Sequence, residues 1–180
     1  MKHPAILLLA PALFACAPDS GPEIAAVAET ETIKTPYGFD VQLTLTPRAA
    51  EKLAQTDEAV NVAAMYYGLP VSDTAPGIDE HGEEVGLGRD DVEVAPQSAL
   101  VVAPGAGFDP TYLASVKGEP EVLVNVYSAR KTHEHNLLSC GIYQGPISMA
   151  QKKPVDIQCD LIDGLNDDGD VVVETGTPGQ

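Results

Sequence analysis

Apolar side chains recur at every second position along several short segments, and this period of two predicts β-strands. The clearest segment spans residues 39–45, whose apolar members are Phe39, Val41, Leu43 and Leu45. The same pattern marks residues 60–66, 92–94, 100–102, 122–126, 138–142 and 155–161. Gly, Pro, Asn and Asp separate these segments, as is typical of turns. The sequence therefore predicts an all-β domain, an antiparallel β-sandwich of the immunoglobulin-like or transthyretin-like type.

Two short helices interrupt the predicted strands. Thr46 followed by Pro47 is typical of a helix start, and the helix is expected over residues 47–55. Asp109 and Pro110 begin a second candidate, which continues to Val116. Each follows a strand, so we expect both to be crossovers that cap an end of the sandwich.

The N-terminal residues predict export from the cytoplasm. Lys2 precedes an uncharged apolar run of 12 residues, Pro4 to Ala15. As a helix this run would span roughly 18 Å, which is too short for a bilayer core of about 30 Å but typical of a secretory signal peptide.

The run ends in Leu13-Phe14-Ala15-Cys16, which resembles the lipobox of bacterial lipoproteins. The resemblance implies that residues 1–15 are a signal peptide and that Cys16 becomes the lipidated N-terminus, with a diacylglyceryl group on sulfur and a further acyl chain such as palmitate. Ala17 in place of Asp implies the outer membrane, with the protein facing the periplasm. The alternative is an ordinary cleaved signal peptide, for which Ala15-Cys16-Ala17 offers a site but Pro18 would follow the cut.

Composition divides the rest of the chain into three parts. Residues 16–36 read as a flexible acidic linker, residues 37–162 as the β-sandwich domain, and residues 163–180 as a disordered acidic tail. The chain carries 27 acidic and 10 basic residues, a net charge of −17. Such a charge argues against nucleic acid as a partner and against adsorption to anionic lipids, so the lipid anchor is the expected membrane contact.

The three cysteines fit this interpretation. Lipidation of Cys16 would leave Cys140 and Cys159, a pair that is expected to form a disulfide bond in an oxidising compartment. Both fall on the apolar positions of their strands, and an antiparallel hairpin turning near Met149 would set them opposite one another.

His133 and His135 are the candidate metal ligands. An H-x-H pair on a strand places both imidazoles on one face, where they could bind copper or zinc. The combination with a sandwich and a disulfide is similar to the copper–zinc superoxide dismutases, but those enzymes need more histidines than the three after Cys16, the third being His81. The segment is also polar and loop-like, so we expect weak metal uptake, no bound cofactor and no enzyme activity; the chain carries none of the common catalytic motifs.

Leu123 and Tyr127 are the candidate partner surface. If Val122, Val124 and Val126 face the core, these two side chains point outward. An apolar outer face suits protein docking, although coverage by the linker, a loop or a helix would explain it equally. The predicted function is a non-catalytic binding or accessory module of an envelope complex, with a protein partner that the sequence does not identify. The alternative is a periplasmic copper or zinc binding protein that uses His133 and His135.

Overall fold

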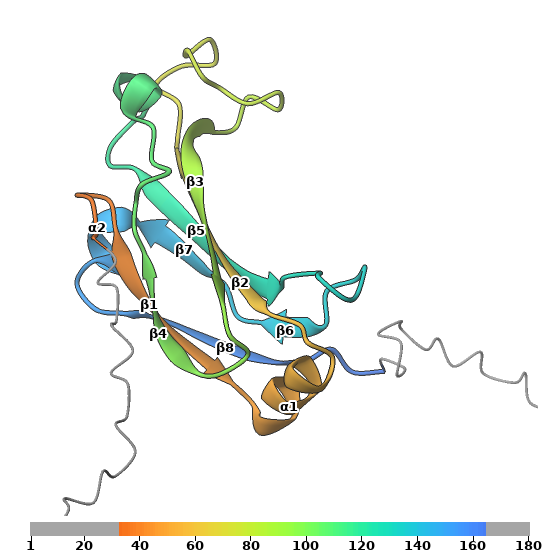
Figure 1. Cartoon of the computed structure of the whole chain (residues 1–180). Helices are drawn as coiled ribbons and strands as arrows, with labels where there is room; N and C mark the ends of the chain where they lie inside the picture. Colours follow the sequence, from red (N-terminus) through yellow and green to blue (C-terminus); the bar gives the residue numbers. More distant parts are fainter. Residues whose placement is uncertain (1–32, 165–180) are drawn as a thin grey trace, which may run out of the picture. The chain divides into compact units, whose positions relative to one another are not determined.

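The computed structural model describes residues 33–164, and these form an all-β domain with few helices (Figure 1), as predicted. Eight strands appear in this range: β1 (Phe39–Leu45), β2 (Val60–Gly68), β3 (Val85–Val94), β4 (Ala99–Ala103), β5 (Glu121–Ser128), β6 (Leu138–Cys140), β7 (Tyr143–Pro146) and β8 (Val155–Leu161). They make two four-stranded sheets. Sheet A has the order β4-β1-β8-β6, and sheet B has the order β3-β2-β5-β7.

The core follows from the period of two. In β1 and β5, buried and partly exposed residues alternate along the strand, so one face of each strand is apolar and dry. The inward side chains of both sheets belong to one hydrophobic cluster, in which Tyr66, Phe39 and Leu43 are among the largest fully buried side chains. Each such side chain contributes roughly 1.5–3 kcal/mol, so this shared core stabilises both sheets together.

One strand pair departs from the predicted antiparallel arrangement. β1 and β8 run parallel at the centre of sheet A, with Val41 opposite Val155 and Leu45 opposite Cys159. Within residues 33–164, every other strand pair of the two sheets is antiparallel. Parallel neighbours need a long connection, and here nearly the whole domain lies between the two strands.

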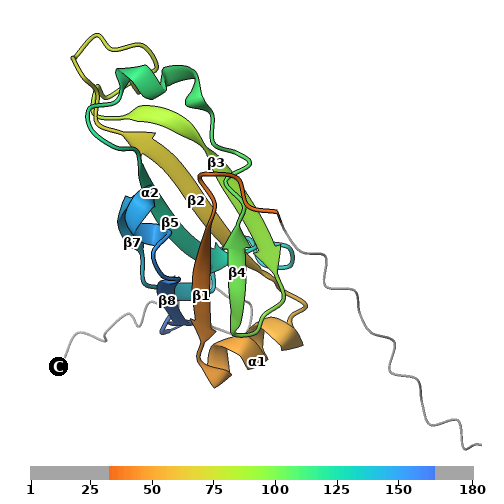
Figure 2. The same cartoon turned by 90° about the vertical axis from the view of Figure 1, so that its left-hand side faces the viewer.

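The helices connect the sheets, as expected. α1 (Pro47–Gln55) leads from β1 in sheet A to β2 in sheet B, and Thr46 caps it by accepting the Ala49 N–H. The 3-10 helix η1 (Pro110–Ser115) leads from β4 to β5 and is capped by Asp109. The two lie at opposite ends of the domain (Figures 1 and 2). A third short helix, α2 (Ile147–Ala150), precedes β8.

Some strands differ from the sequence prediction. β3 begins at Val85, not near Val92, and β7 and α2 were not predicted. In β4 the buried residues are Val101 and Ala103, whereas Leu100 is 57% exposed. β4 consists of five consecutive apolar residues, which carry no alternation. The predicted inward positions, Leu100 and Val102, were therefore wrong.

The N-terminal edge of the domain is well anchored. The Thr35 N–H donates to the Pro104 carbonyl, and the Tyr37 ring stacks on Phe108 with centroids 3.5 Å apart. Cys16, the signal peptide and residues 165–180 lie outside the described residues. Within residues 33–164, no helix has the length and apolar character needed to cross a membrane.

Candidate functional site

The predicted partner surface lies on the outward side of sheet B. Val122, Val124 and Val126 are buried, and Leu123 and Tyr127 of β5 have the opposite parity and are half-buried. Strand register sets neighbours beside them: Leu123 lies opposite Met65, and Tyr127 lies opposite Asn61. We call the outward side chains of the three neighbouring strands the sheet-B outer face. Its members are Asn61, Ala63, Met65 and Tyr67 of β2, Arg89, Asp91 and Glu93 of β3, and Glu121, Leu123, Asn125 and Tyr127 of β5.

Tyr127 is the centre of a hydrogen-bond network on this face. Its hydroxyl accepts from Asn61 Nδ2 and from Arg89 Nη2, each at 2.7 Å. Arg89 also donates two hydrogen bonds to Asp91, at 2.6 and 2.7 Å, and Asn61 donates to the same carboxylate at 2.8 Å. The guanidinium of Arg130 lies 5.7 Å from the centre of the Tyr127 ring. The ring is therefore held in one orientation by its neighbours.

The ion pair fixes the charge state of this network. The hydrogen bonds from Arg89 hold the pKa of Asp91 below its ordinary value, although burial acts in the opposite direction. The hydrogen bonds to Asp91 correspondingly raise the pKa of Arg89. Both groups stay ionised at neutral pH, and together they contribute no net charge to the face.

A second tyrosine network lies further along the same strands. Tyr67 donates from its hydroxyl to Glu121 Oε2 at 2.8 Å and accepts from Gln144 Nε2 at 2.7 Å. Burial raises the pKa of Tyr67 to about 12, so the hydroxyl keeps its proton at neutral pH. The half-buried pair Met65 and Leu123 lies between the two networks.

The geometry of this face suits binding. The tyrosine hydroxyls of the two networks have hydrogen-bond partners on neighbouring strands, so their positions are fixed. Ala63, at the centre of the face, is only 1% exposed, because the longer side chains around it leave no gap. A closed surface with an apolar centre and a polar rim resembles the organisation of protein–protein interfaces.

The predicted metal ligands lie in a loop and not on a strand. Glu58, 2% exposed, accepts the backbone N–H groups of Lys131 and Thr132 as well as the Thr132 hydroxyl. Burial opposes the charge of Glu58, but the hydrogen bonds outweigh it and hold its pKa below the ordinary value. The carboxylate thus fixes the start of the loop that carries His133 and His135. No group of three or more metal-ligating side chains is found in residues 33–164.

The predicted disulfide is present. Cys140 of β6 pairs with Cys159 of β8 in antiparallel register, and their sulfur atoms are bonded. The connection between them is no simple hairpin, since β7 crosses to sheet B and α2 follows before the chain returns.

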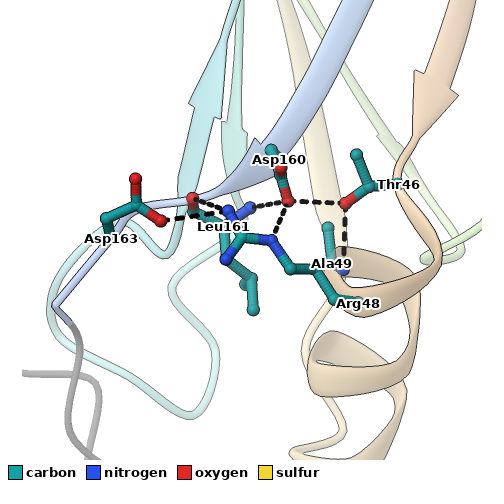
Figure 3. Close-up of polar contacts among 6 residues, drawn as sticks. All are labelled: Thr46, Arg48, Ala49, Asp160, Leu161 and Asp163. Carbon is teal, nitrogen blue, oxygen red and sulfur yellow. Dashed lines mark hydrogen bonds and ion pairs between the residues drawn. The ribbon is translucent and has the colours of Figure 1, made fainter.

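A polar cluster next to the disulfide joins α1 to the end of β8 (Figure 3). Arg48 Nε donates to Asp160 Oδ1 at 2.6 Å, and Thr46 donates to the same oxygen. A second Arg48 nitrogen reaches Asp163 at 3.1 Å. The hydrogen bond from Arg48 holds the pKa of Asp160 far below its usual range. These groups are exposed and paired, so we assign them to stability.

Sequence reasoning found two residues of the sheet-B outer face and missed the rest. The parity of β2, with Val60 and Val62 inward, would have placed Asn61 and Met65 outward. Arg89 and Asp91 gave no such signal, because β3 is an edge strand rich in glycine and charge. The sequence also did not show which strands are neighbours, because the pairing of distant segments leaves no local pattern.

The comparisons add no relative to this description. No family model, no curated protein and no solved structure matches the chain.

Proposed function

We propose that the protein is a lipoprotein of the bacterial envelope, anchored through Cys16 and facing the periplasm, that docks a partner protein on the sheet-B outer face. The observation that carries the docking function is the apolar pair Met65 and Leu123, held between two ordered tyrosine networks. Anchoring is supported by the residues that resemble a lipobox, Leu13 to Cys16. The expected location is the outer membrane.

We also propose that the two sheets form a sandwich of the transthyretin-like type. Immunoglobulin-type sheets keep the first two strands of the fold as neighbours in one sheet. Here β1 and β2 belong to different sheets, and β1 pairs with β8. This strand order favours the transthyretin-like alternative.

The face suits docking for an energetic reason. Tyr127 and Arg89 already have fixed positions, so a partner that binds them loses little side-chain entropy. Tyr and Arg are also enriched among the residues that dominate binding energy. The paired charges form the rim, where they would steer a partner without adding net repulsion.

Crosslinking in intact cells tests the docking surface. A photoreactive amino acid at Asn125, in the centre of the face, should yield a discrete crosslinked product from the full-length lipoprotein. The same probe at Leu100, which is exposed on β4 of sheet A, should not. The double variant Leu123→Asp with Tyr127→Asp should lose the Asn125 product. Tyr127→Phe keeps the ring and should retain most of it.

Thermal unfolding is the necessary control. If the double variant melts far below the wild type, the two side chains are internal packing and the surface is wrongly assigned. If it melts normally and the Asn125 product persists, the partner binds elsewhere.

A further inference from the structure

The edge of sheet A next to β6 contains a gap. β6 pairs with β8 only at Cys159, Asp160 and Leu161, whereas β8 begins at Val155. Figure 1 shows β6 beside the C-terminal part of β8 alone. We call the uncovered stretch of this edge, residues 155–157, the β8 notch.

One residue of the notch, Asp156, directs its backbone N–H and carbonyl toward the open side of β8. The Cys159 carbonyl accepts from Thr46 next to β1, and the Gln158 carbonyl accepts from Gly141 on the opposite side. Because successive residues of a strand alternate in this respect, Asp156 also directs its N–H and carbonyl to the open side. No hydrogen bond to these two groups from outside the strand ladder is found among residues 33–164.

The rest of this edge is closed by a side chain. Asn136 Nδ2 donates to the Leu138 carbonyl at 2.7 Å, and the Leu138 N–H donates to Asn136 Oδ1 at 3.0 Å. The amide thus occupies the outward groups of Leu138 as a neighbouring strand would. Natural proteins usually cover or protect sheet edges that have unpaired backbone groups. We therefore asked which segment could cover the open notch next to the covered β6.

A partly apolar cavity lies at the notch. It has a volume of about 240 Å³ and is lined by Tyr143, Met149, Ala150, Lys153, Pro154, Val155 and Asp156. Lys153 is the basic residue of this lining, and Asp156 is the acidic one. The exposed side chains Ile142 and Met149 add apolar surface close by. An occupant should therefore be extended and mainly apolar, with an acidic side chain that can pair with Lys153.

We propose that the segment Asp170–Glu174 of this same chain docks in the β8 notch as a short added strand. Its sequence is Asp-Val-Val-Val-Glu, so three β-branched residues lie between two acids. Valine favours the strand conformation, and Glu174 can pair with Lys153. Backbone hydrogen bonds to Asp156 and an apolar side chain in the cavity are the two contacts expected of an added strand.

The segment is within reach of the notch. Val173 lies nine positions after Gly164, the last described residue, and nine extended residues span up to about 30 Å. Asp156 lies eight residues before Gly164, at most about 26 Å away along β8. A tether of this length gives an effective concentration in the millimolar range, so even a few contacts would populate the docked state. This docking is independent of the sheet-B outer face.

Amide hydrogen exchange on the full mature chain tests the proposal. The Asp156 and Gln158 amides should exchange about tenfold more slowly in the wild type than in a variant with Val171, Val172 and Val173 all changed to Asp. Steady-state heteronuclear NOE values of Val171–Val173 should match those of the domain. Lys153→Glu and Glu174→Lys should each speed the exchange, and the double variant should restore protection.

Three results would overturn the proposal. Equal exchange at Asp156 and Gln158 in the wild type and the triple variant would show that the segment covers nothing. Domain-unlike NOE values at Val171–Val173 would show that it is not docked. Protection that rises with protein concentration would assign the occupant to a second copy of the chain. Thermal unfolding of the triple variant confirms that the domain is folded in each comparison.

Discussion

At the scale of single residues, Glu58 connects ionisation to the stability of the loop that follows β5. Its carboxylate is almost fully buried and accepts hydrogen bonds from the adjacent Ala59 N–H and from the Lys131 and Thr132 N–H groups of the loop. A charged acceptor with several N–H donors is worth more than a neutral one, whereas a buried charge without them would be costly. The loop that carries His133 therefore depends on one ionised side chain.

Glu58→Gln should lower the free energy of unfolding by about 2 kcal/mol at pH 7, because one charged acceptor is lost and the amide NH₂ faces N–H donors. The pKa of Glu58 is lowered in the fold, so its contribution is complete above the unfolded pKa of about 4.3. It is lost as the pH falls through the folded pKa. Urea unfolding from pH 7 to pH 3 should show the gap between the two proteins closing below about pH 4.

Glu51→Gln is the matched control, since Glu51 is exposed on α1 and accepts a hydrogen bond from the Gln55 side chain. It should change stability by less than about 0.5 kcal/mol at any pH. A gap for Glu58→Gln that stays constant down to pH 3 would show that the carboxylate charge is not what matters.

At the scale of elements, β6 is a three-residue edge strand that is stabilised by an additional interaction on each side. The disulfide ties it to β8, and Asn136 covers its outer side. A strand this short contributes few ladder hydrogen bonds, so these two additions determine whether it stays in place.

Removing the disulfide with Cys140→Ala and Cys159→Ala should cost about 3 kcal/mol of unfolding free energy, because the bond closes a loop between residues 19 apart. Urea unfolding of the two proteins measures the difference. Thiol titration of denatured, non-reduced wild type should find neither cysteine free. Two reactive thiols from this pair would contradict the assignment.

Asn136→Ala should destabilise the domain by about 1–2 kcal/mol, since it removes hydrogen bonds to Leu138 and to Ser128. It should also uncover the β6 edge and promote association. Chemical unfolding reports the first effect and light scattering the second. Asn136→Asp keeps the acceptor but not the donor, so it should fall between the two in stability. A variant as stable and as monomeric as the wild type would exclude the edge-covering role.

Elements with local signals were predicted well. Alternation gave β1 its observed bounds, and Thr46-Pro47 gave α1. Elements that form through contacts with distant segments were not predicted. β7 consists of Tyr-Gln-Gly-Pro and shows no apolar alternation. In β3, glycines and charged residues interrupt the alternation. The parity of Cys140 and Cys159 predicted their bond correctly, although the path between them passes through the other sheet.

At the scale of the whole molecule, the negative net charge disfavours contact with a membrane, whereas the proposed lipid anchor favours it. A chain of charge −17 is repelled by anionic surfaces, so a stable membrane location requires a hydrophobic anchor. The lipidation proposed at Cys16 would supply one, because each buried CH₂ of an acyl chain contributes about 0.8 kcal/mol. Location is therefore predicted to depend on a single residue outside the described domain.

Cys16→Ala should move the protein from the outer membrane fraction to the soluble periplasm, or leave it uncleaved in the inner membrane. Cell fractionation with immunoblotting distinguishes these outcomes. Cys140→Ala, which leaves the lipobox intact, is the control and should remain in the outer membrane fraction. A cleaved Cys16→Ala protein that still fractionates with the outer membrane would rule out the lipid anchor.

The candidate site was partly predictable at this scale. Leu123 and Tyr127 followed from the parity of one strand, but the network around Tyr127 needs Asn61 and Arg89, which come from two other strands. Only the register of β2 with β3 and β5 brings them together. The sequence of each strand taken alone does not show which other strand it pairs with, or in which register.

The parallel pairing of β1 with β8 has a consequence for biosynthesis. β1 is among the first described segments to leave the ribosome and β8 is the last, yet each is the other's neighbour at the centre of sheet A. Sheet A therefore cannot close while the C-terminal third of the chain is still being translated. Such an order of events delays folding until synthesis is nearly complete. For a polypeptide that is exported across a membrane in the unfolded state, this delay would leave more time for export before the domain folds.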